Sequence, residues 1–232
     1  DNLTANFPRN STDKFFDTDH SAKYEGWLDR SLNLITDMQL RDADMWRLFV
    51  EQFRGNPDDH DAGWRGEFWG KMMRGACFVY SYSRDKALYN VLKQTVSDLV
   101  DSQDELGRIS TYSVEKEYDG WDLWSRKYVL LGMEYFIEIC DDQEFNNKII
   151  DCMKKQVDYL MQRIGWQTEG KLLITRLTRH WRGLNSSSIL EPIVRLYSLT
   201  NEQKYLDFAG YIVECGGTDV ENVFELAYRD QL

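Results

Sequence analysis

The sequence contains only three prolines, so little in it interrupts long helices. It also lacks any apolar run close to the roughly 20 residues that a membrane-spanning helix needs. Its formal net charge is −11, whereas proteins that bind nucleic acid or an anionic membrane need a basic surface. We therefore expect a folded protein that binds neither nucleic acid nor a membrane.

Short motifs for common chemistry are missing as well. We find no zinc-ligand pattern, no P-loop, no GxSxG sequence and no dinucleotide-binding glycine fingerprint. The four cysteines have no CxxC spacing and lie on apolar helical patterns, which predicts buried free thiols. We accordingly expect no metal site and no cofactor in this segment. The cysteines are Cys77, Cys140, Cys152 and Cys215.

The sequence does contain a helical repeat. One amphipathic helix is predicted at about 21–54, and Trp64, Trp121 and Trp181 then open three similar segments at spacings of 57 and 60 residues. Each segment has an aromatic, polar entry, an apolar helix, a short polar break and a charged amphipathic helix. The three entries and apolar helices are "WRGEFWGKMMRGACFVYSYS", "WDLWSRKYVLLGMEYFIEIC" and "WRGLNSSSILEPIVRLYSLT".

This alternation predicts an α/α fold. A helix that is apolar nearly all round is buried on several sides, whereas a helix with one charged face borders solvent. We predict an all-α (α/α)6 toroid or barrel over residues 21–232, after an extended segment at residues 1–20 that has no signal-peptide pattern. Its last helix is expected to begin near Asp219. These helices fill more than half of a six-hairpin ring, so we expect the barrel to be incomplete here and to continue beyond Leu232.

Aromatic and polar residues gather where the inner helices begin, at 63–71, 118–128 and 180–188. In a ring these ends converge on one mouth. Tryptophans beside polar groups suit sugars, because C–H faces pack on aromatic rings and hydroxyls need hydrogen bonds. We therefore expect a carbohydrate substrate. The candidate sugar-binding residues are Trp64, Glu67, Lys71, Trp121, Asp122, Arg126, Lys127, His180 and Asn185.

Each candidate also has a structural explanation. The tryptophans can close the repeats as plugs, and Glu67 can pair with Lys71 at i,i+4 or complement the helix dipole. Asn185 can cap the third inner helix. Arg126 and Lys127 lie in an otherwise apolar helix, where unpaired charge is costly, so at least one of them needs a partner. Spacing alone assigns no pair of catalytic carboxylates.

Three stretches carry a resemblance to a known family. They begin "GWRGEFWGKMMRGACFVYSYSRDKALYNVLKQ", "WDLWSRKYVLLGMEYFIEI" and "LNSSSILEPIVRLYSLTNEQKYLDFAGYIVE", and the likeness covers most of residues 25–215. Over this length the chain resembles the N-terminal catalytic part of the β-L-arabinofuranosidase-type glycoside hydrolases of family 127 and its relatives.

The resemblance implies an (α/α)6 barrel followed by β-sandwich domains, and a retaining mechanism with a cysteine nucleophile near zinc and a glutamate acid/base. None of the four cysteines matches that cluster, so catalytic residues, and any zinc, are expected beyond Leu232. Glu67 and Lys71 stand where many relatives have histidines, and Arg126–Lys127 stands in place of a His-Lys pair. These departures indicate a changed sugar. Two alternatives stay open: another carbohydrate-active α/α enzyme, such as a lyase or epimerase, and a non-catalytic helical-repeat binding module.

Overall fold

The computed structural model describes residues 23–61, 63–178 and 180–231. The regular secondary structure of the described residues is helical, and their β-structure consists of two isolated bridges, Ile164–Leu172 and Gly217–Asn222. The predicted extended segment at residues 1–20 lies outside the described residues. The helices are α1 Trp27–Ile35, α2 Ala43–Gly55, α3 Glu67–Ser83, α4 Lys86–Asp101, α5 Asp122–Ile139, α6 Gln143–Arg163, α7 Leu184–Ser187, α8 Leu190–Thr200, α9 Gln203–Glu214 and α10 Val223–Tyr228.

Three antiparallel hairpins form where the repeat predicts them: α3 with α4, α5 with α6, and α8 with α9. The polar breaks supply the turn chemistry. Arg84 and Asn201 end α3 and α8 in the left-handed conformation. Asp85 and Asp142 then cap α4 and α6, because their carboxylates accept hydrogen bonds from backbone N–H groups of the first turn. The all-α hairpin fold expected from the sequence is confirmed.

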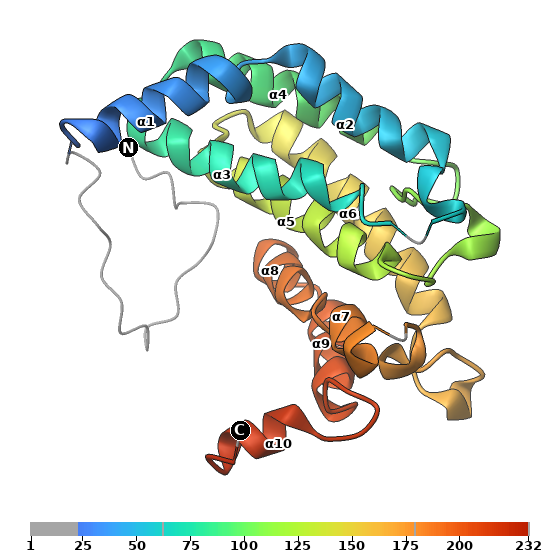
Figure 1. Ribbon diagram of the computed structural model, residues 1–232. Helices are drawn as coiled ribbons and strands as arrows, with labels where there is room; N and C mark the ends of the chain where they lie inside the picture. Colours follow the sequence, from blue (N-terminus) through green and yellow to red (C-terminus); the bar gives the residue numbers. More distant parts are fainter. Residues whose placement is uncertain (1–22, 62, 179, 232) are drawn as a thin grey trace.

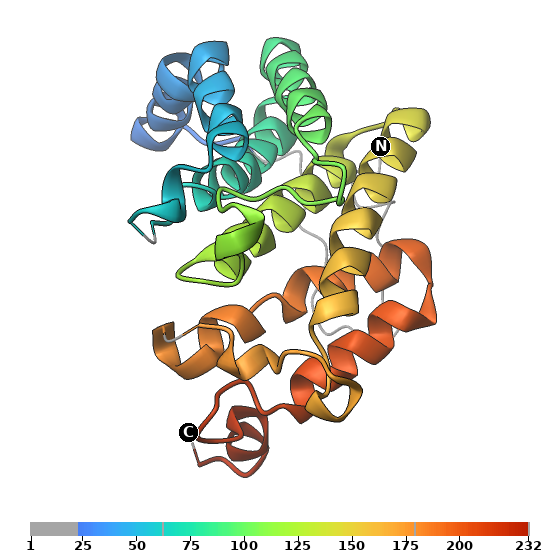
Figure 2. The same ribbon diagram turned by 90° about the vertical axis from the view of Figure 1, so that its right-hand side faces the viewer.

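The hairpins form two layers on an arc (Figures 1 and 2). Helices α3, α5 and α8 form the inner layer, and α1, α2, α4, α6 and α9 lie outside them. The layering follows the composition of the helices: the middle inner helix, α5, is buried over most of its length, whereas α4 and α6 bury one face each. The arc brings the starting ends of the inner helices to the same side of the molecule.

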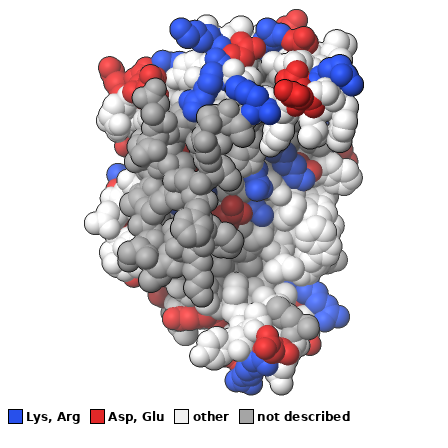
Figure 3. All heavy atoms as spheres, turned by 90° about the vertical axis from the view of Figure 1, so that its left-hand side faces the viewer, with Lys and Arg blue, Asp and Glu red and all other residues white. Residues whose placement is uncertain are grey.

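Basic and acidic side chains lie interspersed on the face drawn in Figure 3, above and below the grey region. A site on this protein must therefore be judged from its own charged residues and not from the net charge. Within the described residues, no helix is both long and apolar enough to cross a membrane.

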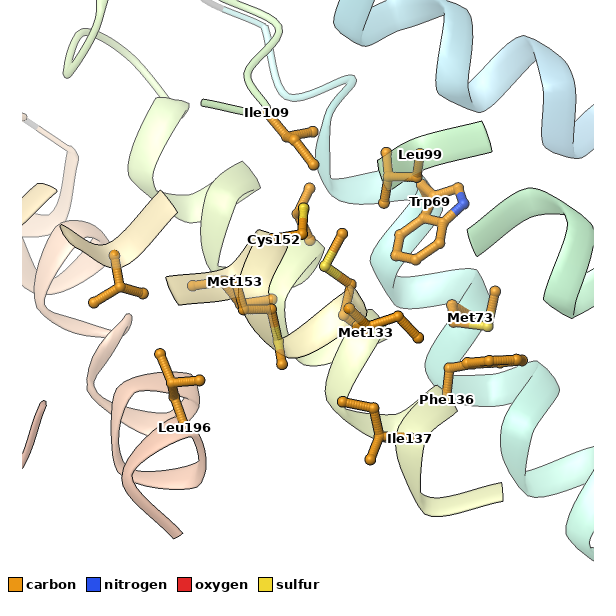
Figure 4. Close-up of a cluster of buried hydrophobic side chains, with 14 of the residues drawn as sticks. Trp69, Met73, Leu99, Ile109, Met133, Phe136, Ile137, Cys152, Met153 and Leu196 are labelled. Atoms are coloured by element: carbon orange, nitrogen blue, oxygen red, sulfur yellow. The ribbon is translucent and has the colours of Figure 1, made fainter. Parts of the chain in front are cut away.

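The core is densest between α3 and α5. A Cβ on Gly70 would lie 1.8 Å from the carbonyl oxygen of Tyr128, so the backbones of the two helices touch there. Gly132 faces Gly70 and the ring of Trp69. Figure 4 shows Trp69 of α3 and Phe136 of α5 among the side chains of this buried cluster. This packing fixes the spacing between the first two inner helices.

The predicted helix at about 21–54 is divided in the structure. It consists of α1, a π-helical turn at Thr36–Leu40, and α2. The Thr36 hydroxyl donates to the carbonyl of Leu32 at 2.7 Å, a bond that bends helices. Asp42 then caps a new helix by accepting from Asp44 N and Met45 N at 3.0 and 3.1 Å. The periodicity predicts one uninterrupted helix, but the chain forms two, and the second begins at the Asp42 N-cap.

The third inner helix and the last helix also begin later than the sequence predicts. Trp181 and Arg182 have φ of 51° and 54°, and Gly183 has φ of 90°, so the chain turns through three left-handed residues before the short α7 and then α8. Gly183 also packs on the backbone of Thr175, where a Cβ would lie 2.1 Å from the carbonyl oxygen. The last helix starts at Val223 instead of near Asp219, behind an Asn222 cap.

Candidate functional site

The entries to α3 and α5 and the turn before α7 meet at one group of aromatic rings. Trp121 is at its centre: its ring centroid lies 6.4 Å from that of Trp64, 5.9 Å from Trp124 and 5.1 Å from Trp181. His180 stacks on Trp121 at 4.4 Å with an interplanar angle of 13°. We call these five residues the tryptophan cluster. The expected convergence of the inner-helix ends therefore exists.

Two hydrogen bonds of one tyrosine hydroxyl hold the first two entries together. The Tyr112 hydroxyl donates to the carbonyl of Gly63 at 2.6 Å and accepts from the backbone N–H of Trp121 at 3.1 Å. Because Gly63 precedes Trp64, a single phenol links both tryptophan-bearing turns. Tyr112 is 1% exposed, so its ring is packed firmly between the two turns.

The tryptophan cluster is open at its edges. Trp64 is 52% exposed and Trp181 is 57% exposed, while Trp121 and Trp124 are half-buried between them. Their rings meet at steep angles, so ring faces remain outside the mutual contacts. Exposed aromatic faces beside polar groups form the kind of surface on which the C–H side of a sugar packs.

A charged pair borders the cluster on α3. Glu67, the first residue of α3, accepts a hydrogen bond from the indole N–H of Trp124 with one oxygen. Its other oxygen lies 2.9 Å from the ammonium of Lys71, one turn later. Both donors fix the carboxylate beside the indole, and each of its oxygens keeps acceptor capacity for a sugar hydroxyl.

Lys127 of α5 lies on the same rings. Its ammonium is 4.7 Å from the ring centroid of Trp124 and 5.1 Å from that of Tyr128. Burial lowers its pKa from the ordinary value; Glu191 opposes this shift, and the nearby cations Lys71 and Arg74 reinforce it. No carboxylate of the described part of the chain lies within 4.0 Å of this ammonium.

Asp122 and Arg126 form a buried polar network behind the tryptophan cluster. Asp122 accepts from the Ser110 hydroxyl at 2.6 Å, from the Tyr118 N–H at 2.8 Å and from Arg126 Nε at 2.9 Å. Arg126 Nη2 also lies 3.1 Å from Glu117. Burial disfavours the charge on Arg126, but the two carboxylates outweigh it and raise its pKa. Asp122 and Glu117 are therefore the partners that a charged residue such as Arg126 needs in an otherwise apolar helix.

The Asn185 side chain is likewise buried and hydrogen-bonded to the backbone. Its amide nitrogen donates to the carbonyl of Gly120 at 3.3 Å, and the Thr178 hydroxyl donates to the same carbonyl at 2.9 Å. The Asp122, Arg126 and Asn185 side chains lie in residues that are at most 2% exposed. We therefore assign them a positioning role, in place of the direct sugar contact expected from the sequence. The other six candidates, Trp64, Glu67, Lys71, Trp121, Lys127 and His180, lie together in or beside the tryptophan cluster.

The sequence candidates omitted two residues of this surface, Trp124 and Tyr128. Their ring centroids are 5.2 Å apart on α5. The signal was present, because Trp121, Trp124 and Tyr128 follow one another at spacings of three and four residues, which places them on one helix face. Arg74, whose guanidinium lies 5.2 Å from the Tyr135 ring centroid, extends the charged border along α3.

The described residues do not fit the zinc site that the family resemblance implies. No group of three His, Cys, Asp or Glu among them could hold a metal ion. Three cysteines are buried in the core, Cys215 is half-buried, and all four are free thiols, as the apolar patterns predict. Burial raises the pKa of the Cys152 thiol to about 12, which disfavours the thiolate that binds metals. No chemical step is assigned to a metal held by these residues.

Comparison with known proteins identifies the family of the chain. No curated protein matches it. A solved structure that is similar is that of Ara127N-Se, a GH127 β-L-arabinofuranosidase from Geobacillus stearothermophilus T6, with a TM-score of 0.62 at 16% identity. The match covers 90% of this chain and 35% of that one, so the chain spans about a third of this relative's length. This likeness supports the α/α fold. The family model of the β-L-arabinofuranosidase GH127 catalytic domain matches residues 5–231, and the chain therefore belongs to that family.

Proposed function

We propose that this chain forms the sugar-binding wall of a glycoside hydrolase that resembles the β-L-arabinofuranosidases. One observation carries the proposal: three inner-helix entries, far apart in sequence, bring Trp64, Trp121 and Trp181 together beside the polar residues Glu67 and Lys127. In a hydrophobic core these rings would be buried, and on a surface without a binding function three tryptophans would not be expected to cluster.

The residues divide the work of holding a glycan. The exposed rings of Trp64 and Trp181 take the apolar face of a sugar, and Trp121 sets the angle between them. The Glu67 carboxylate, fixed by Trp124 and Lys71, accepts hydrogen bonds from hydroxyls. Such groups orient a ring and its glycosidic bond before any bond breaks.

We propose that the groups that cleave the bond lie in the part of the enzyme that the described residues do not include, since the chain spans about a third of the length of the solved relative. Inside the described ranges, Glu67 is the one carboxylate that contacts the tryptophan cluster by a hydrogen bond, and retaining or inverting hydrolysis requires a second catalytic group on the other side of the glycosidic bond. Zinc, if the whole enzyme binds it, belongs to that part.

The experiment begins with the intact mass of the polypeptide from its source. That polypeptide is then assayed with 4-nitrophenyl β-L-arabinofuranoside and with plant glycans, and products are separated and identified. Reducing sugar released without ultraviolet-absorbing ends supports the proposal. Unsaturated, ultraviolet-absorbing ends would indicate a lyase, and glycan binding without any turnover would indicate a binding module.

A matched pair of variants connects any activity to this wall. Trp64→Ala removes an exposed ring of the cluster, whereas Trp27→Ala removes a tryptophan of α1 that is 68% exposed and makes no contact with the cluster rings. The proposal expects a raised KM for the Trp64 variant alone. Equal KM values in both variants would argue that the cluster does not hold substrate.

A further inference from the structure

Two ammonium groups share one pair of rings beside the tryptophan cluster. Lys71 lies 5.5 Å from the Trp124 ring centroid and 4.8 Å from that of Tyr128. Lys127 lies 4.7 and 5.1 Å from the same two centroids. Like charges this close repel each other, and the repulsion is strongest where burial limits screening by solvent.

The two lysines differ in what neutralises them. Lys71 has an ion-pair partner, Glu67, at 2.9 Å. Lys127 is half-buried and has no carboxylate within 4.0 Å among residues 23–61, 63–178 and 180–231. Glu191 of α8 acts on it from further away, and Arg74 adds a third positive charge on α3. The positive charge at Lys127 therefore lacks a close counterion.

We propose that Lys127 binds the carboxylate of an acidic sugar, so that the substrate of this site carries a uronic acid unit. The inference rests on the proposed function, because it names the substrate class for the same site. The rings of Trp124 and Tyr128 hold the ammonium of Lys127 in place by cation–π contacts. A carboxylate placed there pairs with Lys127 and relieves its repulsion with Lys71, while the tryptophan cluster takes the apolar side of the sugar ring.

Two other charged groups among the described residues contain a cation with a close counterion. Arg195 also contacts an aromatic ring, Tyr135, at 4.7 Å, but it pairs with Glu134 and Glu138. A hollow of about 670 Å³ between α4 and α6 is lined by acids, with Lys148 paired to Asp101. By contrast, the Lys127 ammonium has no close carboxylate among the described residues and lies on half-exposed aromatic rings.

The test measures binding by the natural full-length polypeptide of two probes that differ at one carbon, D-galacturonate and D-galactose. Quenching of tryptophan fluorescence and titration calorimetry supply independent Kd values. The expected result is that galacturonate binds about tenfold more tightly than galactose, and that high salt removes the difference. Equal Kd values for both probes, or binding of neither, would overturn the inference.

Three variants locate the effect. Lys127→Met keeps the apolar stem on Trp124 and should lose the preference for galacturonate while galactose binding is retained. Lys127→Arg should keep most of the preference. Lys86→Gln, at an exposed position at the start of α4, is the control and should bind as the wild type does. A full preference in the Lys127→Met variant would overturn the inference, and the wild-type salt dependence remains decisive if that variant does not fold.

The two proposals fail separately. A polypeptide that binds galacturonate preferentially but cleaves no glycoside would remove the hydrolase proposal and leave the acidic-sugar site standing. A polypeptide that cleaves arabinofuranosides and binds galacturonate no better than galactose would overturn this inference alone.

Discussion

The indole of Trp121 lies flat on the imidazole of His180, with ring centroids 4.4 Å apart and planes 13° from parallel. This contact joins the entry of α5 to the turn before α7, which is 59 residues later in the sequence. Trp64 and Trp181 meet the same indole nearly at right angles. The geometry of the whole tryptophan cluster therefore depends on one half-buried ring.

Replacing Trp121 should weaken sugar binding more than it weakens the fold. Trp121→Ala removes the ring that orients Trp64 and Trp181, and we expect glycan affinity to fall on the order of tenfold. The ring is half-buried and part of the surface, so the loss of unfolding free energy should be modest. Calorimetric Kd values and urea unfolding of the same preparations measure both effects.

The control for this prediction is Trp46→Ala. Trp46 is 1% exposed and donates to the carbonyl of Leu40 at 2.9 Å, so its loss should cost about 3–5 kcal/mol in stability. Unchanged glycan binding by Trp121→Ala together with a stability loss like that of the control would show that Trp121 is a structural plug.

Two glycines of α3 should respond in opposite directions to the same substitution. Gly70→Ala places a Cβ 1.8 Å from the Tyr128 carbonyl oxygen, and two helix backbones would have to separate. Gly75 has no atom within 4 Å of an added Cβ, so Gly75→Ala should stabilise the protein by up to about 1 kcal/mol. Thermal melting of both variants tests the pair, and equal melting temperatures would contradict the tight contact between α3 and α5.

The sequence predicted the hairpins because their signals are local and repeated. The apolar stretch after Glu67 has the helical period, and the polar breaks contain the capping residues Asp85 and Asp142. These signals do not depend on distant contacts. The order of the hairpin helices, and which of them are apolar or amphipathic, could therefore be predicted from the sequence alone.

The start of the third inner helix and part of the site depend on tertiary contacts that no local pattern contains. The left-handed turn at Trp181 and Arg182 forms where Gly183 packs on the Thr175 backbone. Likewise, the sequence could not tell which charges face outward: Lys127 lies on the aromatic surface, while its neighbour Arg126 is buried between carboxylates. Adjacent residues on a helix point about 100° apart, so only the packing of α5 decides this.

The buried Asp122 should be essential to the support of the cluster. Asp122→Ala removes the acceptor of Ser110, the Tyr118 N–H and Arg126, and we expect a loss of about 3–5 kcal/mol in unfolding free energy. Glu115→Gln, at an exposed acid of the same connecting segment, should change it by less than about 0.5 kcal/mol. Chemical denaturation checks both, and a mild effect of Asp122→Ala would mean that Arg126 is satisfied by other groups.

The stability of the inner layer should depend on pH through Glu134. This carboxyl is fully buried on α5, and burial raises its pKa well above the ordinary 4.5, although Arg195 at 3.1 Å opposes the shift. The acids Glu191 and Glu138 add to the rise. Because the folded protein favours the protonated form, this contribution to stability is fully present below pH 4.5 and is lost as pH rises through the raised pKa.

Glu134→Gln keeps the position neutral at every pH. The melting temperature of Glu134→Gln minus that of the wild type should therefore increase as pH rises from below 4.5 toward neutrality. Glu202→Gln is the control of opposite sign, because the hydrogen bond from Lys154 lowers the Glu202 pKa, and the wild type gains on that variant as pH rises through the lowered pKa. Thermal scans of the three proteins across this range decide the matter: a constant difference between Glu134→Gln and wild type would show that folding leaves the Glu134 pKa unchanged, and a wild type that gains on Glu134→Gln would show that Arg195 keeps Glu134 ionised.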